Sequence, residues 1–183
     1  MPSQRQLGPS DVTAVAGRVL AALADAHVAA SPFRYWLLEE VLPEAAGEAV
    51  TALPFEAPVI ADTQGRRETH NSTRVFFSPE NRRRFAVCEA IAAAFQNPRT
   101  VGALEACCGI DLGGAFLRIE YCQDAGDFWL EPHTDIGAKL FTMLVYLSRA
   151  SEASGWGTAL SLALALKLAQ VQKSARIRSS ARG

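Results

Sequence analysis

The stretch Tyr121-Cys-Gln-Asp-Ala-Gly-Asp-Phe-Trp-Leu-Glu-Pro-His-Thr-Asp135 decides how the rest of the chain is interpreted. It ends in the pair His133 and Asp135, which follows a turn region from Asp124 to Asp127. Side chains two residues apart on extended backbone project to the same side. An imidazole and a carboxylate placed in this way can reach one metal ion. The stretch therefore indicates half of a metal site.

Two protein ligands alone do not define a metal centre. Two His and one carboxylate on one face of an octahedron leave three positions open, which is the arrangement of non-haem Fe(II) oxygenases. His133 and Asp135 would supply two of these three ligands. The pair is also typical of an exposed polar turn between two strands, and a short motif of this kind arises by chance. The surrounding sequence has to distinguish the two interpretations.

The residues on both sides of the pair have a β-type pattern. From Ala115, large apolar and aromatic residues recur with partial alternation, and a second run from Lys139 to Leu147 predicts another strand. The residues that carry this pattern are Phe116, Ile119, Tyr121, Phe141, Met143, Val145 and Leu147. Helical patterns precede these strands, and this order favours an α+β fold over a βαβ repeat.

Four helices are expected in the first part of the chain. Apolar spacing, start signals and stop signals place them at residues 10–26, 43–53, 78–96 and 101–108, with His27 after the first and Thr100 as the cap of the last. A strand or turn is expected around residues 31–38, and a short strand around residues 74–77. Three consecutive arginines, Arg82 to Arg84, point in different directions on a helix, so a solvated face is a better interpretation than a nucleic-acid site.

Bulk composition limits the function classes. The chain has 183 residues, 49% of them apolar, and a formal net charge of −1. This indicates one domain, or one domain with an appendage, and no general attraction to nucleic acid or acidic membranes. The four cysteines lack the C-x-x-C spacing of a zinc or redox site. No signal peptide or membrane span is recognisable, so we expect a cytoplasmic protein with reduced thiols.

The segment Phe116–Thr158 resembles a known family. The run L-R-I-E-Y-x(8)-L-E-P-H-T-D, followed by K-L-F-T-M-L-V-Y-L-S and then W-G-T, is similar to the iron- and 2-oxoglutarate-dependent oxygenases of the prolyl-hydroxylase-like type. The resemblance implies N-terminal helices packed on an incomplete double-stranded β-helix, or jelly-roll, core. It divides the chain into a helical support region, 1–115, the first half of the jelly-roll, 116–158, and an atypical basic tail, 159–183.

The resemblance also implies an activity and a set of site residues. His133 and Asp135 would be Fe(II) ligands, and Tyr121, Thr142, Leu144 and Tyr146 would line the pocket for 2-oxoglutarate. The expected function is that of a dioxygenase, an oxidoreductase that hydroxylates a C–H bond while 2-oxoglutarate is decarboxylated to succinate. The substrate, either a small molecule or a peptidyl residue, is left open.

The sequence departs from the family pattern after Thr158. The family has a second His and then an Arg or Lys that binds 2-oxoglutarate, but no His follows His133 in this sequence. In the tail, strict alternation of Leu predicts a strand, whereas the Ala, Leu, Lys and Gln content favours helix. We therefore expect a truncated or frame-shifted member of the family, with weak Fe(II) binding and doubtful activity.

Two other functions are compatible with parts of the sequence. In one, the chain is a non-catalytic interaction protein in which the barrel remnant is structural and the basic tail binds an acidic partner or nucleic acid. An incomplete jelly-roll would have an open sheet edge and an exposed apolar face, so a partner covering that edge is expected. The other is a cupin-like metal-binding protein, but cupins usually place more His near the first ligand than this chain does.

Overall fold

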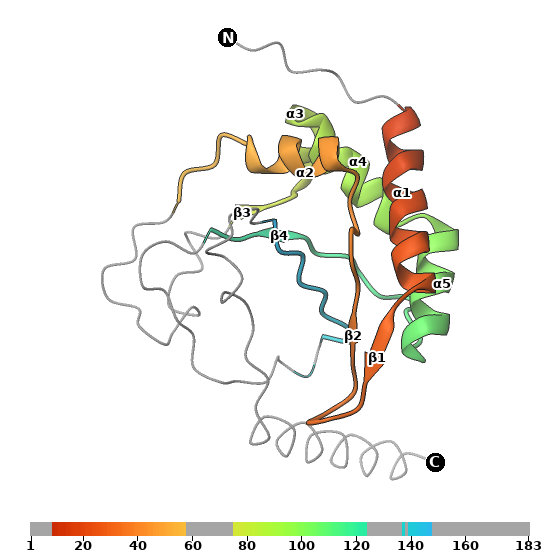
Figure 1. The fold of residues 1–183 in the computed structure, drawn as a ribbon. Coiled ribbons are helices and arrows are strands. Elements are labelled where there is room, and N and C mark those ends of the chain that lie inside the picture. Colours follow the sequence, from red (N-terminus) through yellow and green to blue (C-terminus); the bar gives the residue numbers. More distant parts are fainter. Residues whose placement is uncertain (1–8, 58–74, 124–136, 138, 148–183) are drawn as a thin grey trace, which may run out of the picture. The chain divides into compact units, whose positions relative to one another are not determined.

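A computed structural model describes residues 9–57, 75–123, 137 and 139–147 (Figure 1). The chain separates into two compact units. Unit 1 comprises Met1–Ala26 and Leu38–Leu130, and unit 2 comprises His27–Leu37 and Glu131–Gly183. The division predicted from the sequence, at residues 115 and 158, stays a prediction.

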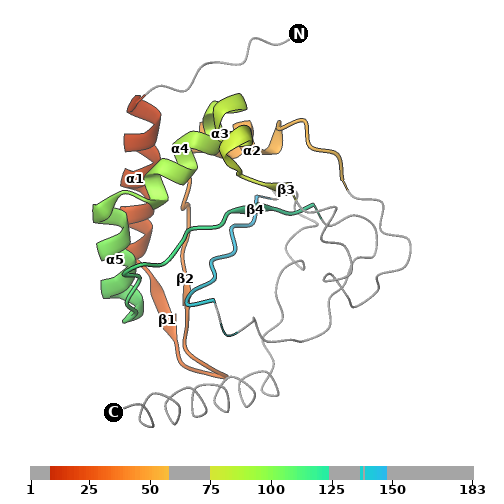
Figure 2. The ribbon, with the colours of Figure 1, turned by 180° about the vertical axis from the view of Figure 1, so that it is seen from behind.

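Unit 1 contains all five described helices. They are α1 (Pro9–Ala24), α2 (Glu44–Thr51), α3 (Pro79–Arg84), α4 (Ala86–Phe95) and α5 (Pro98–Cys108). The central element is α4, which packs against α1, α2 and α5. Figures 1 and 2 show α1 lying beside α4 and α5 from both sides. The first two helices lie close to the predicted ranges of 10–26 and 43–53.

Apolar burial holds these helices together. Six of the ten residues of α4 are buried, so this helix is apolar on most of its surface. Facing it, α1 contributes Val15 and Val19, whose side chains are at most 1% exposed. Removing a Val-sized side chain from water contributes roughly 1.5–3 kcal/mol, so each of these two valines stabilises the helical unit substantially.

The single helix predicted for residues 78–96 is wrong, because the chain breaks at Phe85. Phe85 has φ −123° and ψ 111°, which is extended backbone between α3 and α4. Its side chain is only 6% exposed. The helical pattern predicted burial of Phe85 correctly. The extended backbone places this ring in the core while α3, which has no buried residue, stays at the surface.

Polar contacts hold α3 in place across the break. The backbone N–H of Asn81 donates to Ser78 Oγ over 3.2 Å, which caps the start of α3. Arg82 Nε lies 2.7 Å from Glu89 Oε2, and this ion pair joins α3 to α4. The hydrogen bond from Arg82 lowers the pKa of Glu89 from its usual value.

The start of α5 differs from the prediction. Asn97 is the cap, since its side chain accepts a hydrogen bond from the backbone N–H of Arg99 over 2.9 Å. Thr100 lies inside the helix, is fully buried, and has no partner for its hydroxyl. The predicted end is confirmed: Gly109 follows the helix with φ 65°, a left-handed conformation that glycine adopts without strain.

Unit 1 also contains a two-stranded antiparallel sheet. Strands β3 (Val75–Phe76) and β4 (Glu120–Tyr121) pair with Val75 opposite Tyr121. A further hydrogen bond of 3.0 Å, from Phe77 N to Ile119 O, extends the pairing. The predicted strand near residue 75 is confirmed, whereas the strand expected from Ala115 onward is much shorter than its β-type pattern indicated.

Unit 2 contains an antiparallel hairpin that the sequence predicted only in part. Strand β2 (Tyr35–Leu37) lies within the expected 31–38 region, but its partner β1 (His27–Ala29) was not predicted. In the hairpin, Val28 lies opposite Trp36. His27 therefore belongs to a strand and not to the end of α1, which stops at Ala24.

The described residues from 139 to 147, in unit 2, do not form the predicted strand. A strand needs a ladder of backbone hydrogen bonds, and the sheets found in the described residues do not include this segment. Its side chains still alternate between half-buried and exposed from Phe141 to Leu144. The described parts are thus helices with small antiparallel sheets, an α+β arrangement. No helix in these parts is long and apolar enough to cross a membrane.

The unpartnered hydroxyl of Thr100 gives a stability test. We expect Thr100→Val to raise the free energy of unfolding by about 1 kcal/mol, because valine has nearly the same shape and has no hydroxyl to desolvate. Urea denaturation followed by circular dichroism measures the change. Thr100→Ser, which keeps the hydroxyl and deletes the methyl group, is the matched control and should destabilise. A clear loss of stability in Thr100→Val would show that the hydroxyl has a partner.

Candidate functional site

The predicted iron ligands His133 and Asp135 lie outside the described residues. Within the described parts of the chain, no group of three or more His, Cys, Asp or Glu side chains is placed to hold a metal ion. The metal site therefore stays a prediction. The remaining predicted site residues, Tyr121, Thr142, Leu144 and Tyr146, are all described.

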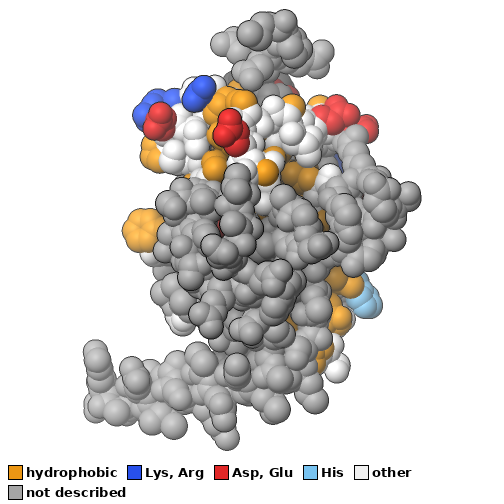
Figure 3. Space-filling view, turned by 90° about the vertical axis from the view of Figure 1, so that its left-hand side faces the viewer, with side chains coloured by type: hydrophobic (Ala, Val, Ile, Leu, Met, Phe, Trp, Pro, Cys, Tyr) orange, Lys and Arg blue, Asp and Glu red, His pale blue; other side chains and the backbone are white. Residues whose placement is uncertain are grey.

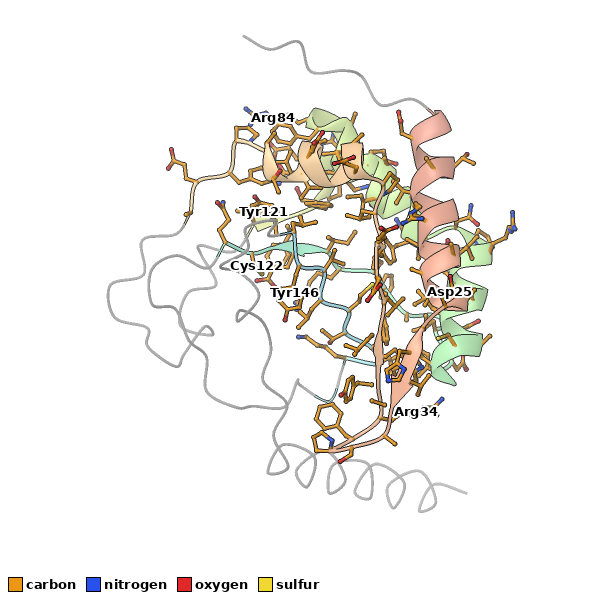
Figure 4. The ribbon with its side chains drawn as sticks, in the orientation of Figure 1. Asp25, Arg34, Arg84, Tyr121, Cys122 and Tyr146 are labelled. Carbon is orange, nitrogen blue, oxygen red and sulfur yellow. The ribbon has the colours of Figure 1, made fainter. Side chains whose placement is uncertain are left out.

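Tyr121 lies in unit 1, at the end of β4 (Figure 4). Its backbone pairs with Val75 in β3, and its side chain is half-buried. This burial raises the pKa of the Tyr121 phenol. The pKa rises because desolvation disfavours the charged phenolate. Tyr121 therefore remains a protonated hydrogen-bond donor at neutral pH and above.

An aromatic cluster supports the Tyr121 ring. The ring of Phe55 meets that of Tyr121 edge to face, with 5.5 Å between centroids and 62° between planes. Phe55 in turn meets Phe85 at 5.3 Å and 86°. The guanidinium of Arg84 lies over the ring of Phe85, 5.1 Å from its centroid. These distances are typical of favourable aromatic and cation–π contacts.

Phe55 is the member of this cluster that sequence reasoning missed. Pro54 indicated extended backbone after α2, but nothing in the periodicity showed where the next ring would point. In the structure, Phe55 N donates to Leu53 O over 2.8 Å, a tight turn around Pro54. Gln123 Nε2 donates to Phe55 O over 2.7 Å. These two contacts fix the backbone on which the ring is mounted.

The other predicted pocket residues belong to unit 2. Thr142, Leu144 and Tyr146 are exposed, and they are separated in sequence by Met143 and Val145. The alternation places the three side chains on one side of the segment wherever the backbone is extended. Because Tyr121 lies in unit 1, a pocket shared with Tyr146 stays a prediction.

Cys88 and Cys107 have structural surroundings within the helices of unit 1. Cys88 lies within α4, is fully buried, and burial raises its pKa to about 11. Cys107 donates through its sulfur to Leu23 O, at 3.8 Å, which joins α5 to α1. A raised pKa removes the thiolate that nucleophilic or metal chemistry needs. Cys88 and Cys108 are both buried and act as small core residues.

The three consecutive arginines do not form a uniform basic surface. Arg82 is paired with Glu89, and Arg84 packs against Phe85. In Figure 3, acidic and basic side chains lie next to each other on the same face. This mixed surface fits the expected solvated face.

Comparison with known proteins identifies no relatives. No protein-family model matches the chain, and neither the curated proteins nor the solved structures contain a significant match.

The burial of Cys88 predicts a large difference in thiol reactivity. With iodoacetamide at pH 8, we expect the exposed Cys122 to be alkylated at least about 100-fold faster than Cys88, because Cys88 is both inaccessible and protonated. Mass mapping of tryptic peptides over time measures the ratio. In urea the two rates should converge. Comparable rates in the folded protein would mean that α4 does not bury Cys88.

Proposed function

We propose that the chain is an Fe(II)- and 2-oxoglutarate-dependent oxygenase, with α1 to α5 supporting an incomplete jelly-roll. The observation that carries the proposal is the segment Leu117–Asp135, in which a strand bearing Tyr121 leads to His133 and Asp135. When bound, iron and 2-oxoglutarate would supply the oxidation of a C–H bond, with succinate and carbon dioxide as products.

The state of Tyr121 fits the proposed role. A hydroxyl that binds a carboxylate must be protonated, and partial burial keeps this phenol in that form. The hydrogen bond to an ionised oxygen is also stronger than one between neutral groups. Tyr121 would hold 2-oxoglutarate through one of its carboxylates, while the cluster with Phe55 limits the rotation of the ring.

His133 and Asp135 would hold the iron. An imidazole nitrogen and a carboxylate oxygen are suitable donors for Fe(II). Within this sequence the pair supplies two protein ligands, and no His follows it. Two ligands bind a divalent ion more weakly than three, so the proposal includes a low affinity for Fe(II).

A second candidate, a non-catalytic interaction protein, is supported by exposed apolar side chains. In unit 2, Leu140, Leu144 and Tyr146 are each about 60% exposed. Val28 and Leu37 of the hairpin are also more than half exposed. Where exposed apolar side chains form one contiguous patch, they are typical of a binding surface. Such a protein would not turn over 2-oxoglutarate, so the assay below separates the two candidates.

Succinate formation tests the proposed activity. We expect the chain to release succinate from 2-oxoglutarate only with Fe(II). Turnover should saturate only at high Fe(II) concentrations, because two protein ligands bind the metal weakly. His133→Ala should abolish the release, since it removes one of two ligands. His27→Ala is the matched control, because His27 is an exposed residue of β1 and should not affect turnover.

Two results would contradict the oxygenase proposal. One is the absence of succinate at any Fe(II) concentration. The other is equal release by the unchanged chain and His133→Ala. Either result would favour the interaction protein.

A further inference from the structure

The surroundings of Tyr121 identify a residue that acts through it. We propose that Phe55 is a positioning residue that orients the Tyr121 phenol toward an anionic ligand. The inference rests on the proposed function, in which that anion is 2-oxoglutarate. It concerns a residue of the loop after α2 that neither the sequence pattern nor the proposed ligand set includes.

Phe55 is contacted at two positions, by Tyr121 at the end of β4 and by Gln123, which follows the strand. Tyr121 contacts its ring edge to face, and Gln123 donates to its backbone carbonyl. Residues two apart on extended backbone lie on the same side, so Tyr121 and Gln123 both face the loop. Any shift of Phe55 would therefore move the Tyr121 ring and strain the Gln123 hydrogen bond together.

The other side of Phe55 rests on a rigid support. Phe85 is 6% exposed and belongs to the break between α3 and α4, where its backbone N–H donates to Asn81 O over 2.8 Å. A buried ring with a fixed backbone has little freedom to rotate. The contacts run from the buried Phe85 through Phe55 to Tyr121, and the last two side chains are half-buried.

This arrangement has a specific chemical effect. The edge of an aromatic ring is positive and its face is negative, so an edge-to-face pair has a preferred orientation. The Phe55 ring also removes water from one side of Tyr121. It thereby contributes to the desolvation that keeps the phenol protonated. Orientation and protonation state are the two properties that a donor to a carboxylate needs.

The test measures Tyr121 directly. Labelling tyrosine at Cζ with carbon-13 gives one signal for each of the three tyrosines, and Tyr121→Phe assigns the relevant one. In Phe55→Leu, which keeps an apolar side chain and removes the ring, we expect the pKa of Tyr121 to fall toward its ordinary value. We also expect the KM for 2-oxoglutarate to rise about tenfold with kcat changed less than about twofold.

Three further variants control for general structural effects. Phe55→Tyr keeps the ring and should restore both values. Phe33→Leu disrupts a similar edge-to-face pair, Phe33 with Tyr35 in unit 2, and should leave the Tyr121 signal unchanged. If Phe55→Leu fails to fold, Gln123→Ala keeps all three rings but removes the hydrogen bond to Phe55 O, so that Phe55 can move away from Tyr121, and it should shift the Tyr121 pKa in the same direction.

The outcomes separate this inference from the proposed function. An unchanged Tyr121 pKa in folded Phe55→Leu overturns the positioning role, whatever the activity. If 2-oxoglutarate with Fe(II) leaves the Tyr121 signal of the unchanged chain unmoved, the proposed function fails instead. A shifted pKa with the same KM in Phe55→Leu and the unchanged chain also overturns the positioning role.

Discussion

The burial of Phe85 is the contact on which the described part of unit 1 depends. A continuous helix through this region would not bury the Phe85 ring and at the same time keep the arginines of α3 in water. The chain therefore leaves helical geometry at this residue, and α3 and α4 become separate elements. The same ring then supports Phe55, so a break in a helix determines where the side chain of Tyr121 lies.

The helical core gives this contact its rigidity. Because α4 is buried on most sides by α1, α2 and α5, the residue at its start has little room to move. The short sheet of β3 and β4 adds only a few hydrogen bonds and is not stable by itself. Tyr121 thus owes its position more to side-chain packing on the helices than to the sheet that contains it.

Elements with strong local signals could be predicted from the sequence. The periodicity of α1, the Pro43 start of α2, the Ser78 cap and the Gly109 stop each have a local physical cause, and the structure has them nearly as expected. The break at Phe85 and the placement of Phe55 depend on contacts between distant residues, which periodicity does not encode. For the same reason the β-type pattern of 139–147 predicted a strand that the described residues do not form, although burial alternates from Phe141 to Leu144.

In the candidate site, too, local sequence signals could be predicted, whereas contacts between distant residues could not. The sequence identified Tyr121 from its place before the His-x-Asp pair, and its neighbours Phe55 and Gln123 emerged only from the fold. The family resemblance supplied the proposed chemistry, whereas the physical state of the phenol comes from its burial.

The most direct test of this account is the affinity of the chain for 2-oxoglutarate, measured by calorimetry with Fe(II) present. Replacing Tyr121 by Phe should weaken binding about tenfold or more, because a hydrogen bond to a charged oxygen is lost. Tyr35→Phe, a change in the hairpin of unit 2, should leave binding unaltered. Equal affinity of the unchanged chain and Tyr121→Phe, or no binding to either, would contradict the account.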